Sequence, residues 1–316
     1  MGFISEIFGY VLNYLYNILN SYGLAIIIFS VLLRIILIPI TIKQQKAMKK
    51  NAEMQEKMKE IQSKYKNNPE KLNQETIELY KKEKMSPFSG CFSAILQLVI
   101  ILSVFWLVSQ PLTYMKRVNK EVIEQYKTTL TEENNGQKLT YPEIGIISKI
   151  EQEYNNVNNQ LSEEQVENRE ELENKKSDLE KLRINMEFLG LDLSKVPTQN
   201  LGDWKVYIIP ILYVITSFIS IKITTNEQKK QMNKNSKKEV IQENEEDKNK
   251  NDDEMLESMQ QMNNSMQYMM PIMSISIAAI APLGLALYWL VSNILIIIER
   301  FIINKYTEKK EEKEND

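Results

Sequence analysis

The feature that most constrains this chain is an apolar run over residues 23–42, GLAIIIFSVLLRIILIPITI, with one charged side chain, Arg34, near its middle. The run is long enough for a helix that crosses the hydrocarbon core of a bilayer. With a rise of about 1.5 Å per residue, Arg34 lies about 16 Å from the start of such a helix. The run therefore predicts a membrane-spanning helix that holds a cation deep in the membrane.

A charge at this depth points to function. Its cost is about 2.5–3.5 kcal/mol on insertion scales, and charged residues inside membrane spans usually mark functional sites. The other apolar runs show no acidic residue at mid-depth, so we expect Arg34 to lack a buried counter-ion and to need a hydrated cavity or a visiting ligand. Ser30 and Thr41 share its helical face and would form a polar stripe. The alternative is a structural arginine that donates to helix carbonyls.

The composition favours a membrane protein without an enzymatic site. Of the 316 residues, 43% are hydrophobic and 26% are charged, and the two kinds alternate in long stretches, as in a polytopic membrane protein. The chain has no histidine, which is the commonest general base and metal ligand, and its single cysteine, Cys91, cannot form an intrachain disulfide. We therefore expect no enzymatic chemistry, no metal and no cofactor.

The apolar runs predict an all-α polytopic membrane protein with five transmembrane helices around a hydrophilic groove. The predicted spans are residues 23–42, 87–112, 205–224, 266–281 and 284–304. The last two spans come from one apolar stretch that is too long for a single helix and that Pro282 and Gly284 divide into a hairpin. Residues 1–22 predict an interfacial helix on the outer surface, with a short extra span as the alternative.

Lysine and arginine in short loops resist translocation, and this sets the predicted orientation. Residues 1–22 contain neither residue type, whereas residues 43–50 contain four lysines. We therefore expect the N-terminus outside and the C-terminus in the cytoplasm. The remaining segments are then a cytosolic helical hairpin (43–86), an extracellular segment (113–204), a cytosolic loop (225–265) and a cytosolic tail (305–316).

Two of these segments have a helical pattern. In the cytosolic hairpin, Asn68 followed by Pro69 predicts the start of a second helix. Its charge is either a solvated face or a docking surface for clients or the translation machinery. In the extracellular segment, residues 143–188 predict a helical hairpin, with partial disorder as the alternative. The first half of the loop at 225–265 has almost no apolar residues, and we expect it to be disordered.

Three stretches in combination resemble the YidC/Oxa/Albino family of membrane protein insertases. They are residues 32–97, FLGLDLSK at 188–195, and MMPIMSISIAAIAPLGLALYWLVSNILIIIER at 269–300. The resemblance implies a multi-pass protein of the bacterial cell membrane that inserts and helps fold nascent membrane proteins. It also implies a positively charged groove, open to the cytosol and the lipid, along which a client enters the bilayer without nucleotide hydrolysis by the insertase.

The resemblance also implies the residues that line this groove. Arg34 falls on the family's arginine, and Trp289, in the LYW triplet with Tyr288, falls on an aromatic position that contacts clients. Ser30, Gln97 and Ser220 are added because they are expected to face the groove. The implied partners are nascent membrane protein clients and the lipid bilayer. A Sec-type translocon and the ribosome remain open as partners, and no sequence-specific nucleic acid is expected.

The chain departs from the family pattern in three places. The outer segment at 113–204 is longer than in short members, no lipid-attachment cysteine is present near the amino terminus, and the tail at 305–316 is less basic than in members thought to bind ribosomes. The long outer segment leaves a second function open, namely a membrane-anchored assembly factor or receptor that acts through this helical segment. A solute channel is a third function, although polar residues do not recur along several helices as a channel needs.

Overall fold

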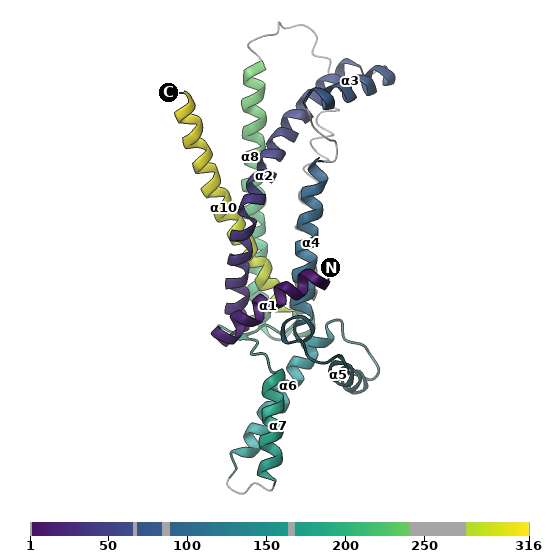
Figure 1. Cartoon of the computed structure of the whole chain (residues 1–316), viewed down its shortest axis with the longest axis vertical. Coiled ribbons are helices and arrows are strands. Elements are labelled where there is room, and N and C mark those ends of the chain that lie inside the picture. The colour runs from purple at the N-terminus through teal and green to yellow at the C-terminus, as the bar shows by residue number, and fades with distance from the viewer. Residues whose placement is uncertain (1, 66–67, 84–88, 164–167, 240–275, 316) are drawn as a thin grey trace. The chain divides into compact units, whose positions relative to one another are not determined.

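The computed structural model describes residues 2–65, 68–83, 89–163, 168–239 and 276–315, and these residues are mostly helical (Figure 1). The chain divides into two compact units. The first unit contains residues 1–33, 99–214 and 275–292, and the second contains residues 34–98, 215–274 and 293–316. Each unit is built from segments that are far apart in the sequence.

In the described part of the chain, four helices are longer than 20 residues: α2 (Tyr22–Lys64), α4 (Ser89–Ser109), α8 (Ile208–Glu239) and α10 (Leu283–Asn315). Within the described residues, three stretches are long and apolar enough to cross a membrane, namely Tyr22–Gln44, Trp204–Asn226 and Leu283–Ile303. Leu98–Ser109 is a shorter apolar helix inside the predicted second span. The predicted fourth span lies largely outside the described residues, so five spans stay a prediction.

The long helices continue well past the apolar runs. α2 passes through Pro39 and ends at Lys64, so the first span and the first helix of the predicted cytosolic hairpin are one element. α8 continues to Glu239, and the expected disorder is therefore wrong for residues 226–239. The Lys, Gln and Glu residues there are good helix formers, and a helix that has already nucleated in the apolar run extends without a new nucleation cost.

The start of the second helix in this segment follows the sequence prediction. α3 (Pro69–Lys82) begins with Pro69, and the Asn68 side chain accepts a hydrogen bond from the backbone N–H of Lys71. An ion pair joins the end of α3 to α2, since the Lys57 ammonium in α2 lies 2.6 Å from the carboxylate of Glu83, the residue after α3. These contacts lie in the second unit and form a helical hairpin between α2 and α3.

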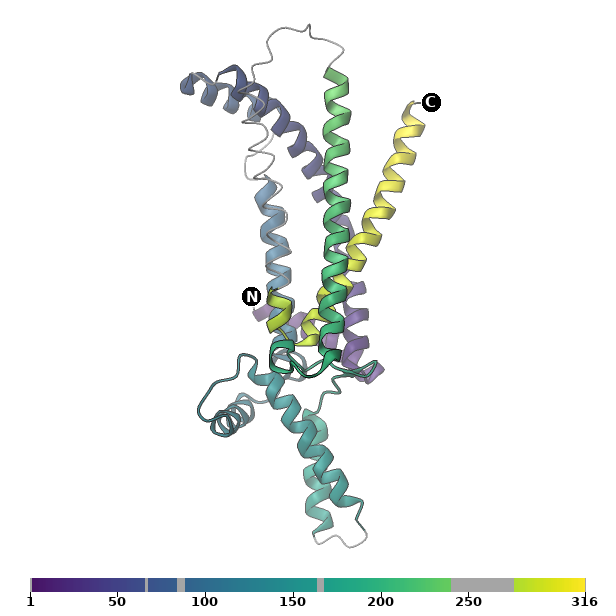
Figure 2. The same ribbon diagram turned by 180° about the vertical axis from the view of Figure 1, so that it is seen from behind.

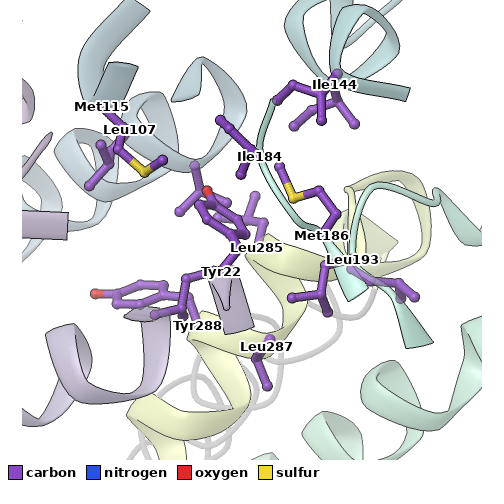
Figure 3. Close-up of a cluster of buried hydrophobic side chains, with 14 of the residues drawn as sticks. Tyr22, Leu107, Met115, Ile144, Ile184, Met186, Leu193, Leu285, Leu287 and Tyr288 are labelled. Carbon is purple, nitrogen blue, oxygen red and sulfur yellow. The ribbon is translucent and has the colours of Figure 1, made fainter. Parts of the chain in front are cut away.

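The first unit has a contiguous apolar core. Figure 3 shows side chains from separate segments gathered there, including Tyr22, Leu107, Met115, Ile184 and Leu285. The strands β1 (Glu187–Phe188) and β2 (Leu191–Asp192) pair as a short antiparallel hairpin next to this core. The backbone N–H groups of Leu283 and Gly284 donate to the carbonyls of Lys195 and Leu193, which joins this loop to the start of α10.

The helix α1 (Gly2–Leu19) packs within the first unit through a narrow buried face. Ser5, Gly9, Leu12 and Tyr16 are buried on this face. Gly9 lies against the π-helix η1 (Leu112–Lys116). The opposite side exposes large apolar residues: Phe3, Ile7, Tyr10, Val11, Tyr14 and Ile18. An apolar exposed side is what the predicted interfacial helix requires.

The rest of the first unit contains α5 (Lys120–Glu133), α6 (Pro142–Leu161) and α7 (Arg169–Leu182). α6 and α7 lie side by side in both views (Figures 1 and 2), where the sequence predicts a helical hairpin. Val157 and Leu179 are buried between polar flanks. Arg183, just after α7, donates two hydrogen bonds of 2.6 Å to the Glu151 carboxylate in α6. A bidentate ion pair, called here the Arg183–Glu151 fork, therefore joins the two helices at the base of this hairpin.

Candidate functional site around Arg34

Arg34 has a counter-ion. Its Nη2 atom lies 2.5 Å from Oε2 of Glu299, which α10 contributes in the second unit. The Glu299 side chain is 8% exposed and that of Arg34 is 19% exposed. Glu299 is the one acidic residue within the three apolar stretches of the described chain that could cross a membrane. The expectation that Arg34 lacks a buried counter-ion is therefore wrong.

Depths counted within separate helices do not indicate Glu299 as the partner of Arg34. Arg34 is near the middle of the predicted span 23–42, whereas Glu299 is close to the end of the predicted span 284–304. Counted from the ends of these spans, the two residues differ in depth by about 4–5 Å at about 1.5 Å per residue. The long side chains of arginine and glutamate bridge such a difference easily.

The contact between Arg34 and Glu299 is a single-point ion pair. Within the described part of the chain, Nε of Arg34 has no hydrogen-bond partner, and neither oxygen of Glu299 meets the geometry of a hydrogen bond despite the 2.5 Å separation. Two parallel N–H to oxygen bonds, as in the Arg183–Glu151 fork, are the stronger arrangement. The charge of Arg34 is therefore neutralised while its hydrogen-bonding capacity is not filled.

Polar side chains also form a seam between α8 and α10. Asn293 donates through Nδ2 to Oγ of Ser217 at 2.7 Å, and Arg300 donates to Oγ1 of Thr224. Both bonds join residues that are 76 positions apart, so α8 and α10 run in the same direction here. Polar groups that hydrogen-bond between helices stabilise contacts between membrane helices.

The predicted groove residues fall in different parts of the structure. Arg34 and half-buried Ser220 belong to the second unit. Ser30 belongs to the first unit, and its buried hydroxyl donates to the Ile26 carbonyl of its own helix at 2.7 Å. Gln97 lies in α4, and its side chain is outside the described part of the structure.

Of the two aromatic candidates, Tyr288 belongs to the core of the first unit and Trp289 packs against it. Tyr288 is buried, and Figure 3 shows it beside the other core side chains. Trp289 is half-buried and its ring centroid lies 5.9 Å from that of Tyr213. The groove that would join these residues to Arg34 stays a prediction.

Sequence reasoning missed Glu299, Arg300 and Thr224 as members of this polar region. A usable signal was present, because Ser217, Ser220 and Thr224 recur at helical spacing on one face of α8. Asn293 and Arg300 are likewise two helical turns apart in α10. The described residues contain no group of His, Cys, Asp and Glu side chains placed to hold a metal ion.

Long apolar helices joined by an ion pair and by hydrogen bonds between polar side chains define a polytopic helical membrane protein. The family model described as 60Kd inner membrane protein matches residues 14–311, and the chain therefore belongs to this family. Relatives bear the name membrane protein insertase YidC, which confirms the resemblance seen in the sequence.

Three relatives show how the similarity is distributed. The protein from Caldanaerobacter subterraneus is 40% identical over 105 residues, which are 33% of this chain and 51% of that protein. The protein from Treponema denticola is 24% identical over 306 residues, 97% of this chain and 38% of that protein. The protein from Francisella tularensis subsp. novicida is 35% identical over 106 residues, 34% of this chain and 19% of that protein. The chain thus spans about half or less of the length of these relatives.

Proposed function

We propose that this chain is a membrane protein insertase that inserts and helps fold nascent membrane proteins without hydrolysing nucleotides itself. The observation that carries this proposal is the under-coordinated Arg34 within an apolar helix, in a chain whose relatives are named as insertases. The proposed clients are nascent membrane proteins, and the lipid bilayer is the surrounding phase. A Sec-type translocon and the ribosome are possible further partners that the proposal does not require.

The proposed role of Arg34 is to hold an acidic side chain of a client while that client enters the bilayer. Two opposite charges 4 Å apart attract by about 4 kcal/mol at an effective dielectric constant near 20, against about 1 kcal/mol in water. A brief interaction of this strength retains a carboxylate and still allows its release. The Nε of Arg34, which has no hydrogen-bond partner among the described residues, is a donor that a client oxygen could fill.

The proposed path is the positively charged groove of the sequence analysis, lined by Ser30, Arg34, Gln97, Ser220, Tyr288 and Trp289. The polar seam supports a path that starts in the second unit, since the hydroxyls of Ser217 and Thr224 lie on one face of α8 and accept hydrogen bonds from Asn293 and Arg300. Hydroxyl groups at such a seam lower the cost of bringing a polar client segment into the membrane, because they replace some of its lost hydrogen bonds to water.

The proposed topology has the N-terminus outside, the C-terminus in the cytoplasm and five spans. The common direction of α8 and α10 supports it, because a chain that crosses a membrane twice in the same direction has to cross back in between. This return is the role proposed for the fourth span at residues 266–281. Placement in the bacterial cell membrane follows from the family.

The test of the proposed function has to neutralise Arg34 without leaving Glu299 charged and unpaired. Removing one partner of a buried ion pair typically costs about 3–5 kcal/mol of stability, so Arg34→Ala or Arg34→Glu alone could fail for lack of folded protein. The informative variant is the double substitution Arg34→Gln with Glu299→Gln, which removes both charges and keeps a polar, unbranched side chain at each position. Arg34→Lys is its matched control.

We expect the neutral double variant to accumulate at the wild-type level and to lose most insertion of clients with an acidic translocated segment. Arg34→Lys should keep much of the activity, since it keeps the charge. The measurement is protease protection of model clients in proteoliposomes that contain the purified protein. Equal insertion of every client by the double variant and the wild type would show that the cation is not used.

A further inference from the structure

A buried carboxylate already sits where a client carboxylate is expected to bind. Glu299 reaches Arg34 from α10, and the rest of the three described apolar stretches offers no other acidic residue. Such a residue is costly inside a membrane span, since each charge loses its hydration there. A second charge placed only to neutralise the first would be expected to form a well-satisfied pair.

The pair of Arg34 and Glu299 leaves hydrogen-bonding positions of both side chains unfilled. A contact of this kind is one that a client carboxylate could replace. Arg34 uses one nitrogen, its Nε has no partner among the described residues, and the Glu299 oxygens lack hydrogen-bond geometry. In contrast, the pair formed by Arg183 and Glu151 uses two bonds of 2.6 Å. The same chemical groups in this chain therefore form a fork at the base of a hairpin and a single-point contact inside the spans.

The flank of Arg34 is open to an incoming apolar chain. Ile35 and Ile36, the next two residues in α2, are 57% and 69% exposed. Exposed isoleucines beside a half-buried cation suit an occupant that is apolar along most of its length and acidic at one point. A membrane protein segment with a single Asp or Glu has this chemistry.

We propose that Glu299 is an internal stand-in for a client carboxylate, which occupies Arg34 in the resting protein and has to be displaced by an acidic client segment. This inference rests on the proposed function. The need to displace Glu299 sets a threshold for client binding at Arg34, because one client carboxylate competes with one internal carboxylate. Clients with several acidic residues exceed the threshold more easily than clients with one, and neutral clients do not use the contact.

The experiment compares three otherwise identical single-span clients whose translocated segment carries no, one or several Asp residues. They are inserted into proteoliposomes with the full-length wild type, Glu299→Gln or Glu299→Asp. We expect Glu299→Gln to raise the insertion rate of the one-Asp client about threefold or more, the several-Asp client less, and the neutral client not at all. Glu299→Asp, which shortens the internal carboxylate, should give a smaller rise for the one-Asp client.

Glu151→Gln is the matched control, because it removes a carboxylate from the arginine pair at the hairpin and should leave the relative rates of the three clients unchanged. An unchanged or lower rate for the one-Asp client with Glu299→Gln, or an equal change for all three clients, overturns the proposal. If Glu299→Gln does not accumulate, Glu299→Asp decides, and the absence of a selective rise overturns the proposal.

The neutral double variant Arg34→Gln with Glu299→Gln separates this inference from the proposed function. If it loses acidic clients while Glu299→Gln gives no selective rise, Arg34 is used and the threshold role of Glu299 is wrong. If the double variant inserts acidic clients as well as the wild type, the proposed role of Arg34 itself is wrong.

Discussion

Two buried carboxylates in this chain, Glu299 and Glu143, differ in the number of ion-pair and hydrogen-bond partners that they have. Glu299 has one ion-pair contact, whereas Glu143, at the start of α6, accepts hydrogen bonds from the backbone N–H of Thr113 at 3.0 Å and from its hydroxyl at 2.5 Å. Glu143 thereby caps the start of the π-helix η1 and joins it to α6. The Glu143 carboxylate is therefore satisfied by two donors from one residue, whereas both oxygens of Glu299 lack a hydrogen-bond partner among the described residues.

The buried position of Glu143 makes a pH-dependent contribution to stability. Burial raises the pKa of Glu143, while the hydrogen bonds from Thr113 act in the opposite direction. A raised pKa in the folded state means that folding favours the protonated form, so this contribution is fully present below the unfolded pKa of about 4.3 and is lost as the pH rises through the folded pKa.

As the pH rises from about 4, the free energy of unfolding of the wild type should fall because Glu143 loses its proton. Glu143→Gln is neutral at every pH, so this fall should be smaller in the variant. The measurement is the unfolding temperature in detergent as a function of pH for the wild type and the variant. Glu153→Gln on the same helix is a control. An identical pH slope for Glu143→Gln and the wild type would contradict the prediction.

At the scale of elements, close packing of α1 against η1 depends on one glycine. A Cβ atom added at Gly9 would lie 2.0 Å from the carbonyl oxygen of Tyr114 and 2.6 Å from its carbonyl carbon. Both neighbours are backbone atoms, so a side chain at position 9 has to move a whole element. The exposed apolar side of α1 can face lipid only while the opposite side remains docked.

Gly9→Ala should consequently destabilise the first unit by about 1–3 kcal/mol, the usual cost of overpacking, although alanine favours helices over glycine by about 1 kcal/mol. Gly2→Ala is the matched control, since a Cβ atom there meets nothing within 4 Å. Thermal unfolding in detergent, followed by circular dichroism, measures the difference. Equal unfolding temperatures for the two variants would show that α1 does not dock as described.

At the scale of the whole molecule, the function could reside in the spans or in the long hairpin of α6 and α7. The hairpin has a core-facing base, where Ile144, Ile147 and Ile150 are buried, and a polar distal part. The Arg183–Glu151 fork closes the base. Removal of the distal part takes away Val157 but keeps the buried isoleucines of the base and the Arg183–Glu151 pair.

Replacement of residues 155–178 by a short flexible Gly-Ser linker tests which part carries the function. If the chain acts as an insertase, insertion of acidic model clients should stay within about twofold of the wild type, because no proposed client contact is removed. Proteoliposomes with the wild type and the neutral Arg34→Gln/Glu299→Gln variant are the two references. Loss of function in the hairpin variant with retention in the neutral variant would favour an assembly factor or receptor that acts through α6 and α7.

The sequence by itself determined the apolar runs, the cap formed by Asn68 at α3, the presence of two helices within residues 143–188 and the family. These properties depend on residues that are neighbours along the chain, because helix periodicity, capping and hydropathy are local. Composition alone does not predict the extension of α8 to Glu239, because the apolar helix that precedes this segment nucleates it.

Only the tertiary structure decided that Glu299 neutralises Arg34, that Tyr288 is buried in the core of the first unit, and that Gly9 lies against the backbone of η1. Each depends on which distant segments meet and at what height, and helical periodicity in one segment carries no information about the register of another. A side chain as long as arginine can reach partners at several depths. The identity of its partner is therefore fixed by the packing of the helices.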